Sequence, residues 1–214
     1  MQRRAFTTTL IAGTALGSLA SVGAQTAGPV DGVHYKTLKV RAPVSAPTGQ
    51  IEVVEFFWYG CPHCNALEPA LETWVGTLAK DVAFRRVPVA FSATHESHQK
   101  LFYTLEAMGA LEAMHRKIFA AIHVERQRLD RDADQVAFVA ANGVDGAKFA
   151  STAKSFSVQT RMRQAKQLTN AYDIDGVPSV GVHGRYLTSG SLAGDNVRSL
   201  SVADFLVDKI RRGA

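Results

Sequence analysis

The sequence predicts one α/β domain that carries a helical insertion, and two observations support this. An almost continuously apolar, β-prone run over residues 51–58 leads into an amphipathic helical pattern, and a second strand pattern follows over 82–91. About eighty residues of helical periodicity then precede two short strand patterns and a last helix. The chain has 214 residues, of which 46% are hydrophobic and 20% charged, so it can bury a core of this size.

The N-terminus differs in composition from the rest of the chain. Arg3 and Arg4 form a basic start, residues 7–20 are uncharged and modestly apolar, and residues 22–24 are small. This layout predicts a signal peptide over residues 1–24 and therefore export from the cytoplasm. A retained membrane anchor is the alternative, which the Thr-, Gly- and Ser-rich composition disfavours. The paired arginines leave both general secretion and twin-arginine export open.

The charge of the chain gives no case for nucleic-acid binding. Cleavage after Ala24 removes two arginines and no acids, so the net charge falls by two, from +5 to +3. A net positive charge this small does not indicate a nucleic-acid-binding surface. Arg161, Arg163 and Lys166 stand at helical spacing and are interpreted as a solvated helix face.

Local signals define the elements of the first half. A short edge strand is predicted over residues 35–40, before a loop rich in Pro and Gly. The run over 51–58 suits a buried central strand, which Gly60 ends. Pro62 suits the first position of a helix, because that position needs no backbone donor. These residues place a cysteine pair at a strand-to-helix junction.

The second half begins with helices and ends with a hairpin and a helix. Apolar stripes predict several helices between residues 94 and 172, and Asp132 with Gln135 resembles a capping box. The closing elements are predicted as strands over 179–182 and 186–188, a turn at His183-Gly184, and an amphipathic helix over 201–210.

The only two cysteines, Cys61 and Cys64, favour redox chemistry over a structural role. A disulfide between them closes a four-residue loop, for which chain entropy predicts about 2 kcal/mol, less than a staple between distant segments gives. Structural zinc needs four ligands, and no further cysteine exists. His95 and His98 lack a metal-site spacing and are interpreted as surface residues of a helix start, so no metal site is predicted.

The junction is expected to make the two sulfurs unequal. Cys61 lies where free backbone N–H groups and the helix dipole stabilise a thiolate. Pro62 fixes the entry of the helix, and His63 adds stabilisation if it is charged or donates; a passive spacer is its alternative interpretation. Cys64 lies further inside, keeps a more ordinary pKa and resolves the mixed disulfide.

Three segments carry a resemblance to a known family. Residues 55–64 (Glu-Phe-Phe-Trp-Tyr-Gly-Cys-Pro-His-Cys), 176–178 (Gly-Val-Pro) and 183–186 (His-Gly-Arg-Tyr) resemble the DsbA-type periplasmic disulfide oxidases. The resemblance covers essentially all of residues 31–211, with order and spacing in agreement. Cys-x-x-Cys alone is a moderate signal, whereas its combination with the distant Val-Pro and the helical stretch is a strong one.

The resemblance implies a thioredoxin fold, a central mixed sheet flanked by helices, with an inserted all-helical subdomain. The first half of the fold is expected over residues 25–92, the insertion over 93–172 and the second half over 173–214. The resemblance also implies a low cysteine pKa and a strongly oxidising couple.

Further site residues follow from the same resemblance. It implies a cis peptide before Pro178 beside the cysteines, with the Val177 backbone able to pair with an extended substrate. Glu55 matches a buried acid that relays protons to Cys64, with an ordinary strand-end charge as the alternative. Glu68 and Arg86 match charged positions near the site. His183 departs from the family, where an asparagine is common before the turn glycine.

The function implied is donation of the Cys61–Cys64 disulfide to newly exported proteins in the periplasm. The redox disulfide is then the only prosthetic element, reduced unfolded secreted proteins are the substrates, and a DsbB-like membrane quinone reductase reoxidises the pair. A monomer is expected, since only residues 25–34 precede the first strand and no dimerisation domain fits there. A disulfide isomerase or reductase of the same fold is the nearest alternative, and a redox-inert peptide-binding chaperone is an alternative from another class.

Overall fold

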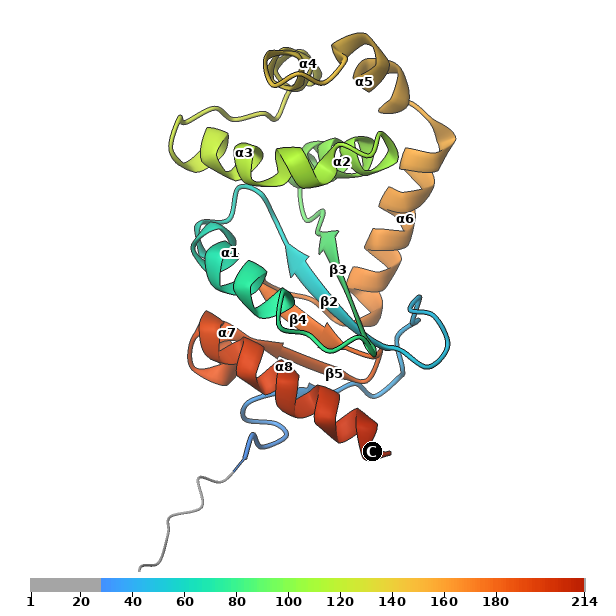
Figure 1. The fold of residues 1–214 in the computed structure, drawn as a ribbon, viewed down its shortest axis with the longest axis vertical. Coiled ribbons are helices and arrows are strands. Elements are labelled where there is room, and N and C mark those ends of the chain that lie inside the picture. The colour runs from blue at the N-terminus through green and yellow to red at the C-terminus, as the bar shows by residue number, and fades with distance from the viewer. Residues whose placement is uncertain (1–27, 214) are drawn as a thin grey trace, which may run out of the picture.

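A computed structural model describes residues 28–213. The predicted signal peptide over residues 1–24 lies outside the described residues. Five strands form one mixed sheet in the order β1-β5-β4-β2-β3 (Figure 1). Central β2 runs parallel to β3 and antiparallel to β4. The strand bounds are β1 Lys36–Thr37, β2 Ile51–Phe57, β3 Val82–Pro88, β4 Ser179–Val182 and β5 Tyr186–Ser189.

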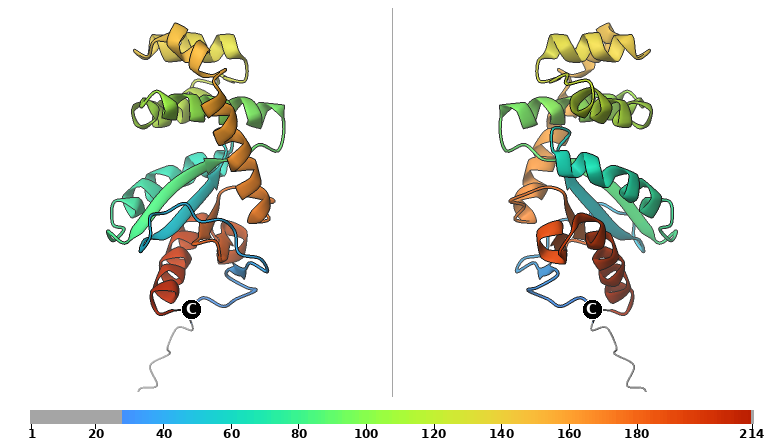
Figure 2. Two further views of the ribbon diagram at one scale, coloured as in Figure 1. Left: turned by 90° about the vertical axis from the view of Figure 1, so that its right-hand side faces the viewer. Right: turned by 90° about the vertical axis from the view of Figure 1, so that its left-hand side faces the viewer.

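The helices fall into two groups. Helices α1, α7 and α8 pack against the sheet, and α8 also contacts α1. Helices α2–α6 lie between β3 and β4 in sequence, and both side views show α2–α5 beyond one end of the sheet while α6 returns to it (Figure 2). The helix bounds are α1 Pro62–Val75, α2 Ala93–Ala107, α3 Leu111–His123, α4 Asp132–Ala141, α5 Gly146–Thr152, α6 Phe156–Ala171, α7 Gly190–Ala193 and α8 Asn196–Arg211.

This architecture is the predicted thioredoxin fold with a helical insertion. Strand β2 is covered on both faces, which explains its nearly continuous apolar run. Val53 packs in a cluster with Leu71 of α1 and Leu206 of α8. Phe56 faces the other way and packs against Tyr172 with ring centroids 5.1 Å apart, in the core that continues into the insertion. The core therefore joins the insertion to the strand that leads to the cysteines.

The turn between β4 and β5 explains the departure at His183. Both central residues are in the left-handed region, with φ of 51° at His183 and 68° at Gly184. A two-residue hairpin turn of this type favours asparagine and glycine, and histidine is among the other residues that tolerate it. The Nδ1 atom of His183 accepts a hydrogen bond from the backbone N–H of Glu52 at 3.2 Å, which anchors the turn.

Two local predictions are wrong. The capping box does not form, because Arg131 is the N-cap residue of α4 without a side-chain cap bond. The Gln135 amide is instead buried and donates to the Leu129 carbonyl at 2.8 Å. His98 is not a surface residue: it is 3% exposed, because α2 turns it inward. In both cases tertiary contacts outweigh a local signal. Among the described helices, none is long and apolar enough to cross a membrane.

Candidate active site

The Cys61 side chain lies at the point where β2 passes into α1. The backbone N–H of Cys61 donates to the Trp58 carbonyl at 3.0 Å and closes a tight turn. Cys61 is the N-cap residue of α1, and Pro62 is the first helical residue, as the sequence predicts. The Cys61 sulfur accepts a hydrogen bond from the backbone N–H of Cys64 at 3.4 Å. Both cysteines are free thiols in this structure.

The two thiols have opposite acid strengths. The hydrogen bond from the Cys64 thiol, together with the backbone N–H groups of Cys64 and His63 and the charge of His63, lowers the pKa of Cys61 to about 6, against the opposing effect of burial. The prediction that Cys64 keeps an ordinary pKa is wrong: Cys64 is fully buried, and burial is the main cause that raises its pKa far above the ordinary value. Near neutral pH the reduced pair therefore consists of a Cys61 thiolate and a Cys64 thiol.

The loop before β4 lies beside Cys61. The Val177–Pro178 peptide bond is cis, and the Cys61 thiol donates to the Val177 carbonyl at 3.5 Å. Pro178 is buried, whereas His63 is exposed. A pocket of about 290 Å³ opens there, with His63, Val177, Pro178 and Asn196 among its lining residues. Val177 therefore both lines this pocket and contacts the Cys61 sulfur.

Two buried carboxyl groups and a partly buried arginine pair with one another near the cysteines. Glu55 of β2 is fully buried, and the Nε of Arg86 lies 3.2 Å from its Oε2. Arg86 also pairs with Glu68 of α1. Burial raises the pKa of Glu55 to about 8, although Arg86 opposes this. At neutral pH Glu55 is mostly protonated, and the charge that it carries when ionised contributes to the raised pKa of Cys64.

Comparison with known proteins places this geometry in a family. Residues 52–200 match the model of the DSBA-like thioredoxin domain. The chain belongs to the DsbA-like thioredoxin family. It is 43% identical to the "Thiol:disulfide interchange protein DsbA" of Burkholderia cepacia, over 88% of this chain and 89% of that protein. It is 42% identical to the protein of the same name from Pseudomonas aeruginosa strain PAO1, over 96% of this chain and 97% of that protein.

Solved structures agree with this membership. The crystal structure of Pseudomonas aeruginosa DsbA superposes with a TM-score of 0.81 at 42% identity, covering 85% of this chain and 94% of that one. The DsbA oxidoreductase of Xylella fastidiosa superposes with a TM-score of 0.81 at 29% identity, covering 86% and 98%. The predicted membership of the DsbA family is confirmed, and the chain is a thiol:disulfide oxidoreductase.

The fold brings together every site residue that the sequence singled out. Val177 and Pro178 lie beside Cys61, although more than a hundred residues separate them from it in the chain. Arg86, which is half-buried, lies within ion-pair distance of the buried carboxyl groups of Glu55 and Glu68. Among the described residues no group of three or more His, Cys, Asp or Glu side chains is arranged to hold a metal ion.

Sequence reasoning missed a set of histidines around the turn before Cys61. Of the seven histidines in the chain, four stand between residues 95 and 123, in the first two helices of the insertion. All four contact Trp58 or Tyr59; they are His95, His98, His115 and His123. The concentration of histidines in one segment is the only signal that the sequence offered for them.

Proposed function

We propose that the chain oxidises newly exported proteins by donating the Cys61–Cys64 disulfide to pairs of their thiols. The single observation that carries this proposal is the inequality of the two sulfurs. A Cys61 pKa of about 6 stabilises the reduced protein as a thiolate at neutral pH. Since this favours reduction of the enzyme, its disulfide becomes a stronger oxidant, by about 30 mV for each 1.4 kcal/mol.

The first chemical step is attack of a substrate thiolate on the Cys61 sulfur. A substrate–Cys61 disulfide forms, the Cys61–Cys64 bond breaks, and Cys64 leaves with the electron pair. Cys64 then takes up a proton, because its buried position raises its pKa. Glu55 is mostly protonated at neutral pH, since burial raises its pKa to about 8, and can supply that proton.

The second step releases the oxidised substrate. A second substrate thiolate attacks the substrate sulfur of the mixed disulfide, a new substrate disulfide forms, and Cys61 leaves as a thiolate. The Cys64 thiol and the backbone N–H groups at the start of α1 stabilise that thiolate, which makes it a good leaving group. Overall the substrate loses two protons and two electrons; the enzyme takes up the electrons and one proton, ending as the Cys61 thiolate and the Cys64 thiol, and the other proton passes to solvent. The Val177 carbonyl beside Cys61 is suited to hold an extended substrate by backbone hydrogen bonding.

The cellular setting is proposed with the chemistry. Residues 1–24 act as the signal peptide, and the mature monomer works in the periplasm on reduced, unfolded secreted proteins. The Cys61–Cys64 disulfide is its only prosthetic element. A DsbB-like membrane quinone reductase restores the disulfide by accepting the two electrons. We likewise propose the division into a first thioredoxin half over 25–92, an insertion over 93–172 and a second half over 173–214.

A peptide oxidation assay tests the proposal. The oxidised protein is mixed with an unstructured peptide that carries two cysteine thiols, and mass spectrometry follows the peptide disulfide. Wild type is expected to oxidise one peptide molecule per enzyme molecule. Cys61→Ser and Cys64→Ser are expected to oxidise none, because neither variant can form the disulfide that starts the reaction. Reduction of a peptide disulfide by the dithiol form, faster than the forward reaction, would instead identify a reductase. Prevention of aggregation that survives Cys61→Ser, with no peptide oxidation by wild type, would identify a chaperone.

A further inference from the structure

Trp58 and Tyr59 receive a polar contact from each of three histidines in the helical insertion. The indole N–H of Trp58 donates to Nδ1 of His98 at 3.0 Å. Nε2 of His123 lies 2.8 Å from the Tyr59 carbonyl oxygen, to which it donates. The Tyr59 hydroxyl and Nδ1 of His115 are 2.8 Å apart. Helices α2 and α3 thereby hold the two residues that β2 delivers to the active-site turn.

The Trp58 indole is enclosed on two sides as well as hydrogen-bonded. One side lies so close to the Gly60 backbone that a Cβ at Gly60 would clash with the ring. The His95 imidazole stacks on the indole, with centroids 4.0 Å apart and planes 24° apart. The ring therefore folds back over its own turn, which the Cys61 N–H to Trp58 carbonyl bond closes. Displacement of the indole would free the turn that presents the Cys61 sulfur to the N–H groups of α1.

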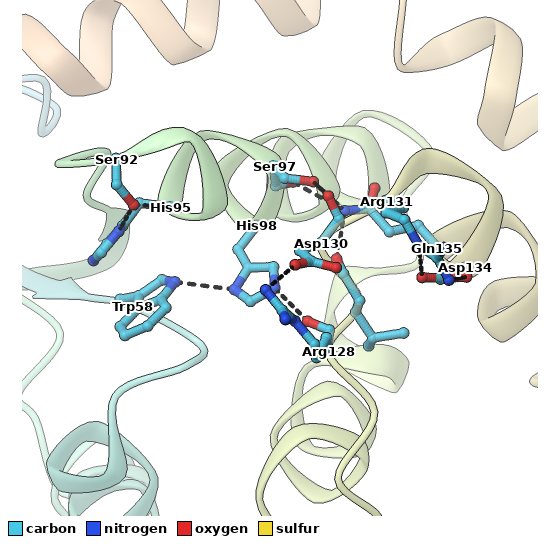
Figure 3. A network of polar contacts seen from close by, with 11 residues as sticks. Trp58, Ser92, His95, Ser97, His98, Arg128, Asp130, Arg131, Asp134 and Gln135 are labelled. Carbon is cyan, nitrogen blue, oxygen red and sulfur yellow. Dashed lines mark hydrogen bonds and ion pairs between the residues drawn. The ribbon is translucent and has the colours of Figure 1, made fainter.

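His98 bonds on both ring nitrogens, as Figure 3 shows. An indole can only donate, so Nδ1 of His98 must be the unprotonated acceptor. Nε2 therefore carries the proton and donates to the Arg128 carbonyl at 2.8 Å. The acceptor that holds Trp58 thus belongs to a neutral imidazole of one defined tautomer.

The segment behind His98 is itself fixed to α2 and α4. The Ser97 hydroxyl donates to the Asp130 carbonyl at 2.9 Å (Figure 3). The Gln135 amide donates to the Leu129 carbonyl at 2.8 Å. Arg128 pairs with Asp130 at 2.7 Å. This anchoring means that His98 cannot follow Trp58 if the turn shifts, so it acts as a fixed support.

We propose that His98 is a positioning residue for the Cys61 thiolate: its Nδ1 holds the Trp58 indole over the turn, and the turn holds the sulfur on the N–H groups of α1. The inference rests on the proposed function for one point only, namely that the Cys61 thiolate takes part in disulfide exchange. The position of the sulfur, and hence its acidity, can be measured without any substrate. The insertion thereby supports the redox centre through the turn before Cys61.

Two nearly isosteric substitutions separate the two bonds of His98. In His98→Asn the amide oxygen can occupy the place of Nδ1, which keeps the acceptor for Trp58 and loses the donor to Arg128. In His98→Gln the amide nitrogen can occupy the place of Nε2, which keeps the donor and loses the acceptor. Both are made in a Trp74→Phe background, so that Trp58 is the one remaining tryptophan. Trp74 is half-buried, donates to Asp204 of α8 at 2.8 Å and packs against the Phe84 ring of β3.

The readouts are the thiolate absorbance of Cys61 against pH and the fluorescence of Trp58. Loss of the acceptor in His98→Gln is expected to raise the pH midpoint of Cys61 ionisation by about one unit, which lowers the thiolate fraction at pH 5 about tenfold. His98→Asn is expected to keep the wild-type midpoint and Trp58 emission. An unchanged midpoint in His98→Gln, or equal losses in both variants, would overturn the proposal, because the second result indicates core packing alone. Peptide oxidation by wild type is measured in a separate assay. Failure of the proposed function would therefore appear there and not as an unchanged midpoint or as equal losses in the two variants.

A measurement on the protein with His98 intact covers the case in which a variant does not fold. Burial is the main cause that lowers the pKa of His98, and the charge of His95 lowers it further. The Arg128 carbonyl and the charge of Asp130 raise this pKa. On the same segment the Arg128 guanidinium pairs with Asp130, and that of Arg131 pairs with Asp134. Protonation places an N–H against the indole N–H, so Trp58 emission in Trp74→Phe is expected to change on acidification below pH 6.5. Emission that stays constant to the onset of unfolding would overturn the proposal.

Discussion

Acidification from pH 7 to pH 5 should remove about 1.4 kcal/mol of stability from the reduced protein through Cys61 alone. The pKa of Cys61 is lowered from an ordinary value of 9.0 to about 6 on folding. A group with a lowered folded pKa adds stability that is fully present above the unfolded pKa and is lost as the pH falls through the folded pKa. The Cys61 contribution is therefore lost progressively between about pH 9 and pH 6, and the step from pH 7 to pH 5 covers the lower end of that window.

The magnitude follows from linkage between ionisation and folding. With these two pKa values the ionisation of Cys61 contributes about 1.4 kcal/mol at pH 7 and less than about 0.1 kcal/mol at pH 5. The same ionisation favours reduction of the disulfide by about 30 mV at pH 7 relative to an ordinary dithiol. Folding also shifts the pKa values of Glu55 and His98, so the total pH dependence of the protein is not a measure of Cys61.

Urea unfolding of reduced wild type and reduced Cys61→Ser at both pH values isolates the Cys61 contribution. Wild type should lose about 1.4 kcal/mol more than the serine variant between pH 7 and pH 5, since the other groups titrate in both proteins. Equal losses in the two proteins would refute the reasoning, because Cys61 would then be protonated at neutral pH. The thiolate absorbance of the reduced protein gives an independent check, with an expected midpoint near pH 6.

Three further substitutions have defined expectations. Gly60→Ala should cost about 1–3 kcal/mol of unfolding free energy by urea titration, because its Cβ meets the Trp58 ring; a neutral result would mean that the ring moves freely. Glu55→Gln should stabilise the protein at pH 7 by about 1–3 kcal/mol, because a carboxyl whose pKa is raised to about 8 opposes folding there, and the gain should vanish near pH 4. Tyr172→Phe should cost about 1 kcal/mol, since its hydroxyl accepts from the Gly184 N–H at 2.8 Å; no loss in thermal or urea unfolding would argue that water replaces that bond.

The sequence by itself determined the fold class, the family and the cysteine pair. These are encoded locally: strand β2 by its apolar run, the start of α1 by Gly60 and Pro62, and the chemistry by the spacing of Cys61 and Cys64. The resemblance further predicted the cis peptide at Pro178, which the structure contains. Such features need only neighbours in the chain, or a motif that the family shares.

Only the tertiary structure decided the environment of the two sulfurs. Whether Glu55 is an ordinary strand-end charge depends on what covers β2, and the complete burial that raises its pKa to about 8 comes from both faces of the sheet. The group of Glu55, Glu68 and Arg86 joins three different elements. Pairings of this kind leave no periodicity in the sequence.

His98 shows why such assignments fail from sequence alone. Its place near the start of α2, among polar residues, is typical of a solvated turn of helix. The fold buries it because α2 crosses the end of β2, where the Trp58 indole supplies a donor and the Arg128 carbonyl an acceptor. A histidine can be buried when both ring nitrogens are satisfied, and those two partners stand 40 and 30 residues away in the chain. The sequence therefore defines the redox pair, whereas the folded insertion defines the support beneath it.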